Sequence, residues 1–228
     1  MRPIEMKQHN APGCLITFCG LDGSGKSTMI RMLTGELLSW DHQILLTKQP
    51  TDAMRRSEIF RTFMDCPDHS QYEYRSLSLM AAADRMQHVS RVIMPALKEG
   101  KTVVSDRYFY SCLANLRARG YGEDTWIYDI ARHIPKPDYA FFLDVPVEMA
   151  VKRVRERPAE KDRYIDMDLQ YRLAEEYRTI CREWGGILIP SSCSIRETFE
   201  IVKQYLISDN TDGLKGNTEY ELGKRKNF

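Results

Sequence analysis

Short apolar runs alternate with longer segments of mixed polarity along most of the chain. Apolar runs rich in β-forming residues predict strands over residues 14–19, 43–47, 102–105, 139–143 and 187–189. Apolar residues recur at helical spacing over residues 26–39, 73–98, 146–157, 168–184 and 194–206. Near-continuous apolar strands that are separated by helices indicate an α/β fold, a five-stranded parallel sheet with helices on both faces.

The predicted fold forms a single domain over residues 11–207. The chain has 228 residues, of which 43% are hydrophobic and 29% are charged, an ordinary composition for one globular domain. Residues 1–10 and 208–228 have little to bury, so both ends are predicted to be tails.

Charge and cysteine content narrow the possible classes of protein. Lys and Arg total 33 against 32 Asp and Glu, which gives no global reason to expect a nucleic-acid or membrane surface. No apolar run approaches the roughly 20 residues that span a bilayer, and the N-terminus lacks the apolar core of a signal peptide. The six cysteines lack the spacing of zinc or redox sites, so we expect reduced, buried thiols. These features predict a soluble cytoplasmic protein without nucleic-acid or membrane partners.

The strongest motif is Gly20-Leu-Asp-Gly-Ser-Gly-Lys26-Ser27, which follows a predicted strand and opens a predicted helix. Backbone N–H groups of such a phosphate-binding loop (P-loop) cradle phosphate oxygens. Lys26 is expected to reach the β- and γ-phosphates of ATP, and the Ser27 hydroxyl to bind Mg²⁺. The alternative, a glycine-rich turn without a ligand, is disfavoured by the strand–loop–helix context. The predicted ATP-binding residues are Gly20, Asp22, Gly23, Ser24, Gly25, Lys26, Ser27 and Thr28.

Two further clusters of charge are typical of phosphate chemistry. Asp106 and Arg107 come at the carboxyl end of an apolar strand, where open parallel sheets bind ligands. Asp106 can order Mg²⁺ or its water shell, and Arg107 can bind a phosphate bidentately. Residues 152–163 hold six Lys and Arg residues, which can stabilise charge on a transferring phosphoryl group. The structural alternative is a strand-end salt bridge for Asp106 and Arg107, and a solvated basic helix face for residues 152–163.

The order of these and further motifs resembles the thymidylate kinase branch of the nucleoside-monophosphate kinases. The segments that carry the resemblance are the P-loop with Asp22, residues 47–52, 79–88, 95–97, 106–111, 137–138, 143–146, 153–157 and 162–164. The resemblance implies a P-loop kinase fold, ATP and Mg²⁺ as cofactors, and phosphoryl transfer to a nucleoside monophosphate. It also implies a homodimer.

Roles follow from the resemblance residue by residue. Asp22 would hydrogen-bond the acceptor sugar, and Arg85 and Arg107 would clamp the acceptor phosphate. Gly23-Ser24 stands where one branch of the family carries a catalytic arginine, so the positive charge would come from a lid at about residues 152–165. The catalytic candidates are Lys26, Arg107, Arg153, Arg157 and Arg163. The predicted acceptor-binding residues are Asp22, Lys48, Pro50, Ala81, Arg85, Arg107, Ser111, Asn115 and Leu116.

Three departures from the family pattern fall in the acceptor site. Ala81 stands where many thymidylate kinases stack an aromatic ring on thymine. Asn115-Leu116 replaces Tyr-Gln, and Lys48-Gln49 replaces Arg-Glu. These changes suggest an altered acceptor, such as a modified pyrimidine monophosphate. Plain dTMP stays open if a nearby ring fills the gap; the candidates are Tyr72, Tyr74, Phe109 and Tyr110.

Two other functions remain open from the sequence. One is a P-loop kinase for a phosphorylated metabolite that is not a nucleotide, which an acceptor screen would separate. The other is a nucleotide-binding regulator without turnover, which acceptor-dependent ADP release would exclude.

Overall fold

A five-stranded parallel sheet forms the centre of the molecule, in the strand order β2-β3-β1-β4-β5. The computed structural model describes residues 3–65 and 72–208; most of the predicted C-terminal tail lies outside them. The strands are β1 (Leu15–Gly20), β2 (Ile44–Lys48), β3 (Thr102–Asp106), β4 (Tyr139–Asp144) and β5 (Ile187–Pro190). Their bounds fall within one residue of the predicted ones, so the predicted sheet is confirmed.

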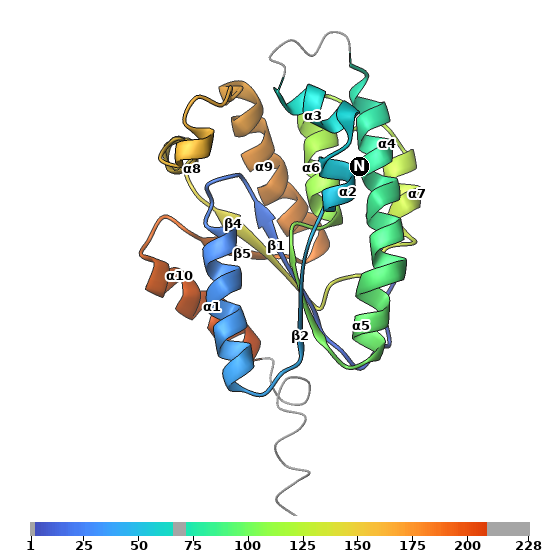
Figure 1. The fold of residues 1–228 in the computed structure, drawn as a ribbon, viewed down its shortest axis with the longest axis vertical. Helices are drawn as coiled ribbons and strands as arrows, with labels where there is room; N and C mark the ends of the chain where they lie inside the picture. Colours follow the sequence, from blue (N-terminus) through green and yellow to red (C-terminus); the bar gives the residue numbers. More distant parts are fainter. Residues whose placement is uncertain (1–2, 66–71, 209–228) are drawn as a thin grey trace, which may run out of the picture.

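Helices cover both faces of this sheet (Figure 1). One face carries α1 (Lys26–Ser39) and α10 (Ile195–Ser208). The other carries α4 (Tyr74–His88), α5 (Met94–Lys98), α6 (Phe109–Ala118) and α9 (Met167–Trp184). Successive side chains of a strand point to opposite faces. In β1, Ile16 and Phe18 therefore join the α1–α10 core, while Leu15 and Cys19 join the core on the other side.

The remaining helices are short and lie around the carboxyl edge of the sheet or on its flank. They are α2 (Asp52–Arg55), α3 (Glu58–Asp65), α7 (Trp126–Ala131), α8 (Val147–Arg155) and the 3₁₀ turn η2 (Pro158–Glu160). The single helix predicted over residues 73–98 is divided by the π-helical turn η1 (Val89–Ile93). Pro95 follows this turn and has no N–H to donate, so a regular α-helical bond is lost there.

The N-terminal segment before β1 is bound to the domain, so its prediction as a tail is wrong. The Lys7 backbone N–H donates to the Ile134 carbonyl oxygen at 2.9 Å, and the Lys136 N–H donates to Lys7 at 2.7 Å. Ile4 and Met6 pack against the core. Two alternating apolar side chains and a pair of backbone hydrogen bonds are enough to order this segment.

The described cysteines are all free. Cys19, Cys112 and Cys181 are buried as predicted, Cys14 is half-buried, and Cys193 is exposed, which corrects the prediction for that residue. Within residues 3–65 and 72–208, no helix combines the length and apolarity needed to cross a membrane.

Candidate active site

A cavity of about 410 Å³ opens where β1, β2 and β3 end. Its wall includes the P-loop, the end of β2, and residues of α3, α4, α6, α9 and the predicted lid. Strand pairing places these distant segments together, because Phe18 of β1 and Lys48 of β2 both lie opposite Asp106 of β3. The carboxyl edge of a parallel sheet is the usual place for a ligand site.

Two glycines give the P-loop its shape. Gly25 caps α1 with a φ of 98°, a left-handed conformation that glycine adopts easily. Gly23 has a φ of 82°, and a Cβ atom on it would lie 2.1 Å from the Ala150 carbonyl oxygen of α8. The close approach of α8 therefore leaves no room for a side chain at position 23, where an arginine could otherwise reach the phosphates.

Lys26 lies inside the loop with only 6% of its surface exposed. Its Nζ donates hydrogen bonds to the carbonyl oxygens of Leu21 at 2.6 Å and Gly20 at 3.2 Å. Burial, followed by the positive charge of Arg107, lowers the pKa of Lys26 to about 7, although Asp22 and Asp106 oppose this shift. The ammonium is therefore held next to the loop in an environment that favours an incoming negative charge.

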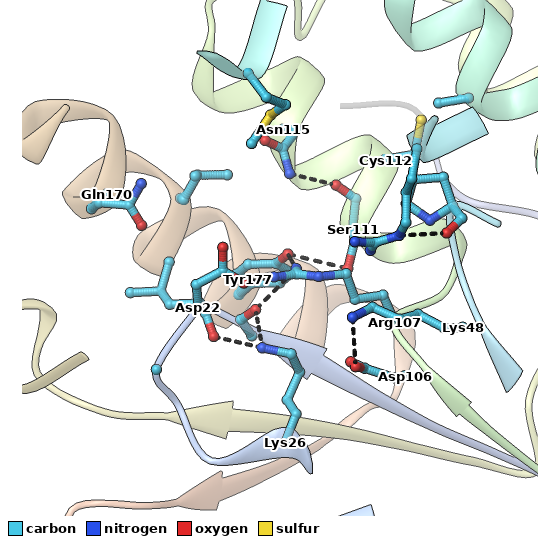
Figure 2. A pocket seen from close by; sticks show the side chains of 18 of the residues that line it. Asp22, Lys26, Lys48, Asp106, Arg107, Ser111, Cys112, Asn115, Gln170 and Tyr177 are labelled. Atoms are coloured by element: carbon cyan, nitrogen blue, oxygen red, sulfur yellow. Dashed lines mark hydrogen bonds and ion pairs between the residues drawn. The ribbon is translucent and has the colours of Figure 1, made fainter. Parts of the chain in front are cut away.

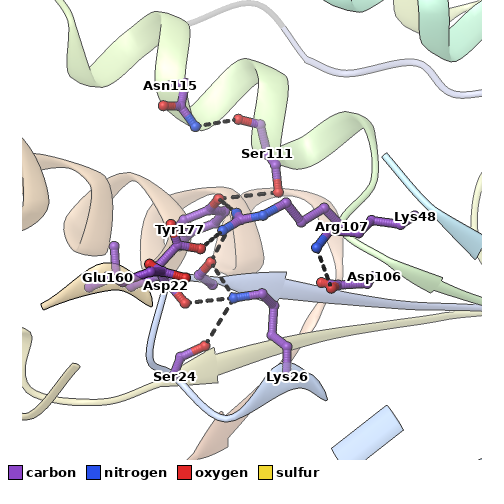
Figure 3. Close-up of polar contacts among 12 residues, drawn as sticks. Asp22, Ser24, Lys26, Lys48, Asp106, Arg107, Ser111, Asn115, Glu160 and Tyr177 are labelled. Atoms are coloured by element: carbon purple, nitrogen blue, oxygen red, sulfur yellow. Dashed lines mark hydrogen bonds and ion pairs between the residues drawn. The ribbon is translucent and has the colours of Figure 1, made fainter. Parts of the chain in front are cut away.

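Arg107 and Asp22 form an ion pair above Lys26 (Figure 3). Arg107 has a φ of 67° at the end of β3, and its Nη1 donates to the Tyr177 hydroxyl at 3.2 Å. Tyr177 in turn donates to Ser111 Oγ at 3.1 Å. Burial disfavours the charged guanidinium, but the Asp22 carboxylate overcomes it and raises the Arg107 pKa. Arg107 likewise holds the Asp22 pKa well below its usual range.

Asp106 offers a free carboxylate oxygen beside the P-loop. One oxygen, Oδ2, lies 3.5 Å from Lys48 Nζ (Figure 2). The other, Oδ1, is buried and has no hydrogen-bond partner among the described residues. Ser27 lines the same cavity. A hydroxyl and a carboxylate oxygen are hard ligands of the kind that Mg²⁺ and its water shell take, so the residues present fit the predicted metal.

The lid arginines do not all lie in the same place. Arg157 and Arg163 line the cavity and both pair with Glu160, at 3.3 and 2.9 Å. Arg163 also reaches Asp22 at 3.2 Å. Arg153 instead donates to the Ser191 carbonyl oxygen at 3.2 Å and lies outside this cavity.

Arg153 lines a second cavity of about 240 Å³ on the other side of the P-loop. Ser24, Gly25 and Thr28 of the loop share its wall with residues of the β5–α10 connection. The predicted lid thus divides into Arg157 and Arg163, which line the same cavity as Lys26, and Arg153, which is bound to the Ser191 carbonyl oxygen.

The predicted acceptor-binding residues line the large cavity with one exception. Those in its wall are Asp22, Lys48, Pro50, Ala81, Arg85, Arg107, Ser111 and Asn115. Leu116 is completely buried in the core behind α6, so the prediction that it faces the acceptor is corrected. Asn115 donates to the Ser111 carbonyl oxygen at 2.9 Å (Figure 2). Arg85 is 3% exposed, and its Nε has no partner among the described residues.

Comparison with known proteins agrees with this geometry. The sequence model of the family described as thymidylate kinase matches residues 18–200. The chain belongs to the thymidylate kinase family. A probable thymidylate kinase of Pyrococcus horikoshii is 38% identical over 184 residues, covering 80% of this chain and 89% of that protein. The thymidylate kinase of Lactobacillus acidophilus is 34% identical over 164 residues, covering 70% and 76%. The chain is therefore an ATP-dependent phosphotransferase that acts on a nucleoside monophosphate.

The structure adds cavity residues that the thymidylate kinase pattern did not identify. Among them are Arg55, Phe60, Phe63, Cys112, Arg119 and Tyr177. Arg119 continues the face of α6 that Ser111 and Asn115 begin, but this spacing becomes a signal only once residues 109–118 are known to form a helix. Phe60 and Phe63 lie on α3, a short separate helix that leaves no comparable signal of where it packs.

Four rings could replace the stacking ring that is absent at Ala81, and they lie in different places. Tyr74 lines the cavity, whereas Phe109 and Tyr110 are buried in the core. Tyr72 packs beside Phe63, with ring centroids 6.0 Å apart. The rings nearest to Ala81 therefore belong to one cluster that contains Phe63, Tyr72 and Tyr74.

Proposed function

We propose that this kinase phosphorylates a pyrimidine nucleoside monophosphate whose base differs from plain thymine. The observation that carries the proposal is the contrast within one cavity. Lys26 and Arg107 line the phosphate end, with Asp22 paired to Arg107, while Ala81 leaves the other end without the expected stacking ring. A retained phosphate site with a changed base site favours the same reaction on a different base.

The phosphoryl transfer would depend on positioning and on positive charge. Lys26 of the loop and Arg157 and Arg163 of the lid line one cavity, so three cations can meet the charge on the transferring oxygens. The acceptor phosphate has a second pKa near ~6 and is largely ionised at neutral pH, so the reaction needs no general base.

Mg²⁺ and the ATP nucleoside have separate candidate sites. Ser27 and the free Asp106 oxygen would hold Mg²⁺, which when bound would neutralise charge on the phosphate oxygens. The second cavity, beside Arg153, would take the nucleoside part of ATP, because it adjoins the P-loop on the side away from the acceptor.

An acceptor panel tests the proposed base choice. Losing one stacked ring costs roughly 1–3 kcal/mol, so dTMP should fall about tenfold or more below the best acceptor in kcat/KM. The panel is dTMP, dUMP, dCMP, UMP, CMP and pyrimidine-modified monophosphates, measured by ADP release. Ala81→Phe supplies the missing ring and should raise kcat/KM for dTMP. If dTMP leads the panel with the wild-type enzyme, the base-choice proposal is wrong.

The oligomeric state and compartment belong to the same proposal. Exposed apolar side chains on α4, with Leu79 46% and Met80 40% exposed, support association of two copies. Free described cysteines fit a reducing cytoplasm. The near balance of charge supports a small nucleotide, rather than a nucleic acid, as the partner.

A further inference from the structure

Arg119 is a cavity residue without an acidic partner among the described residues. Its guanidinium carbon lies 4.4 Å from the centre of the Tyr74 ring and 5.2 Å from that of Phe63. Its Nε is buried and has no hydrogen-bond partner in the described chain. By contrast, Arg107 and Arg163 in the same cavity both pair with Asp22.

The position of Arg119 on α6 identifies the end of the cavity where it lies. Ser111, Asn115 and Arg119 follow one another at a spacing of four residues and all line the cavity. Ser111 accepts a hydrogen bond from Tyr177, which contacts Arg107 at the phosphate end. Eight residues of helix rise about 12 Å, so Arg119, which directly follows α6, lies about that far along the helix from Ser111. Arg119 therefore belongs to the base end.

The surroundings of Arg119 leave its charge available to a ligand. Burial raises the pKa of Tyr74, and the charge of Arg119 and a hydrogen bond from it only partly oppose this shift, so the phenol stays neutral near neutral pH and does not balance the guanidinium charge. Phe63 and Tyr74 belong to the cluster that also contains Ala81, the position where the family's ring is absent. The missing ring and the available guanidinium thus meet in one part of the cavity.

We propose that Arg119 is a specificity-determining residue that donates hydrogen bonds to an oxygen of a substituent on the acceptor's pyrimidine base. The expected acceptor is a pyrimidine monophosphate with an oxygen-bearing substituent, such as a hydroxymethyl or carboxyl group. This inference rests on the proposed function and names the chemistry of its acceptor.

The physical reason is the fixed geometry of the guanidinium. It is planar, has five donors and no acceptor, and matches carboxylate and other oxygens. Contacts with Phe63 and Tyr74 restrict its plane, so less side-chain entropy is lost when it binds. A thymine methyl group offers no acceptor, so it would cover a buried donor without satisfying it.

The test compares dUMP, dTMP, 5-hydroxymethyl-dUMP and 5-carboxy-dUMP by kcat/KM. The wild-type enzyme should prefer at least one oxygen-bearing acceptor to dTMP by about tenfold or more, equivalent to about 1.4 kcal/mol. Arg119→Met should abolish that preference, mainly through the KM of the oxygen-bearing acceptor. Arg119→Lys should keep only part of it, because the charge remains but the planar fork is lost.

Arg75→Met is the matched control. Arg75 lies 4.4 Å above the Tyr121 ring in a similar cation–π contact and pairs with Asp124 at 2.7 Å, but it is not in the cavity wall. Its replacement should leave the ratio of kcat/KM between the oxygen-bearing acceptors and dTMP unchanged. The control therefore distinguishes a role in recognising the base from a role in packing against an aromatic ring.

Two results would overturn the inference alone: a wild-type enzyme that phosphorylates dTMP at least as well as both oxygen-bearing acceptors, or an Arg119→Met enzyme that keeps the preference. The wild-type comparison needs no variant, so it decides the matter even if Arg119→Met fails to fold. If no monophosphate in a broader panel is phosphorylated, the proposed function is wrong and the inference falls with it.

Discussion

Lys26 is a residue whose charge is expected to change when a nucleotide binds. Its side chain is buried, and Arg107 lies close enough to disfavour a second positive charge. A polyphosphate brings several negative charges to the loop, so binding should raise the Lys26 pKa again. The lysine is therefore expected to change from a partly neutral to a fully charged group when ATP binds.

This change predicts proton uptake on nucleotide binding. With a pKa of about 7 in the free protein, Lys26 is mostly neutral at about pH 8, and the bound state takes up close to one proton. Affinity should rise as the pH falls from about 8 towards 7 and level off below, because Lys26 is then already protonated. Calorimetry with a non-hydrolysable ATP analogue, in buffers of different ionisation enthalpy, measures the uptake.

Lys26→Met provides the control for this measurement. It should show no proton uptake at the same pH, and it should also lose several orders of magnitude in kcat, because Lys26 meets the developing charge of the transition state. Zero uptake by the wild-type protein would show that Lys26 is charged before the nucleotide arrives.

At the level of single residues, sequence motifs located the phosphate end better than the base end. The P-loop spacing and the strand-end Asp106-Arg107 pair predict positions that the backbone itself fixes. Leu116 was assigned by its place in a motif, but its direction depends on which face of α6 packs on the core. The resemblance places Arg153 in the lid with Arg157 and Arg163, although α8 directs it to Ser191 instead.

In the lid segment, arginines of the same charge lie in two different places, so their separate roles can be tested by experiment. Arg157 and Arg163 face the large cavity, and Arg153 lies against the other side of the P-loop. We predict that Arg157→Ala and Arg163→Ala lower kcat more than they raise the KM for ATP, because their charges act on the closed transition state. Arg153→Ala should mainly raise the KM for ATP. Steady-state kinetics with both substrates varied gives the two constants.

Lys152→Ala is a suitable comparison for these variants. Lys152 is an exposed cation of the same segment and is not in the wall of either cavity. Its removal should leave both constants near wild type. If Arg157→Ala and Arg163→Ala behave like Lys152→Ala, the basic segment acts only as a solvated surface.

The predicted elements were those with a clear period or a clear apolar run. All five strands were found, because parallel strands buried on both faces form continuous apolar runs. The sequence does not predict α6, because nine of its ten residues are buried and most are apolar, so the polar face of Ser111 and Asn115 is too narrow to set a helical period. The short helices α2, α3 and α7 span 4, 8 and 6 residues, too few to establish a repeat.

In the whole molecule, strand order brings the parts of the site together. β1 pairs with β3, which pairs with β2, so the P-loop after β1, Arg107 after β3 and Lys48 in β2 lie along one edge of the sheet. The sequence predicts the P-loop and the strand-end residues, but it does not predict the part of the cavity wall that α3 forms. That helix reaches the cavity only through the tertiary packing of Phe60 and Phe63. The base end of the site was therefore the part least accessible to prediction.

The last feature of the whole molecule is the exposed apolar surface of α4. Leu79 and Met86 lie seven residues apart on one helical face and are 46% and 37% exposed, and Met80 beside them is 40% exposed. Covering these side chains would stabilise a pair of molecules, so we predict that the protein sediments as a dimer at micromolar concentration. Leu79→Glu should shift it to monomers, since a charge would be buried at the contact. Leu38→Glu, at a 58% exposed position on α1, should leave the dimer intact. Analytical ultracentrifugation of the three proteins decides the point, and a monomeric wild type would exclude this surface as a dimer interface.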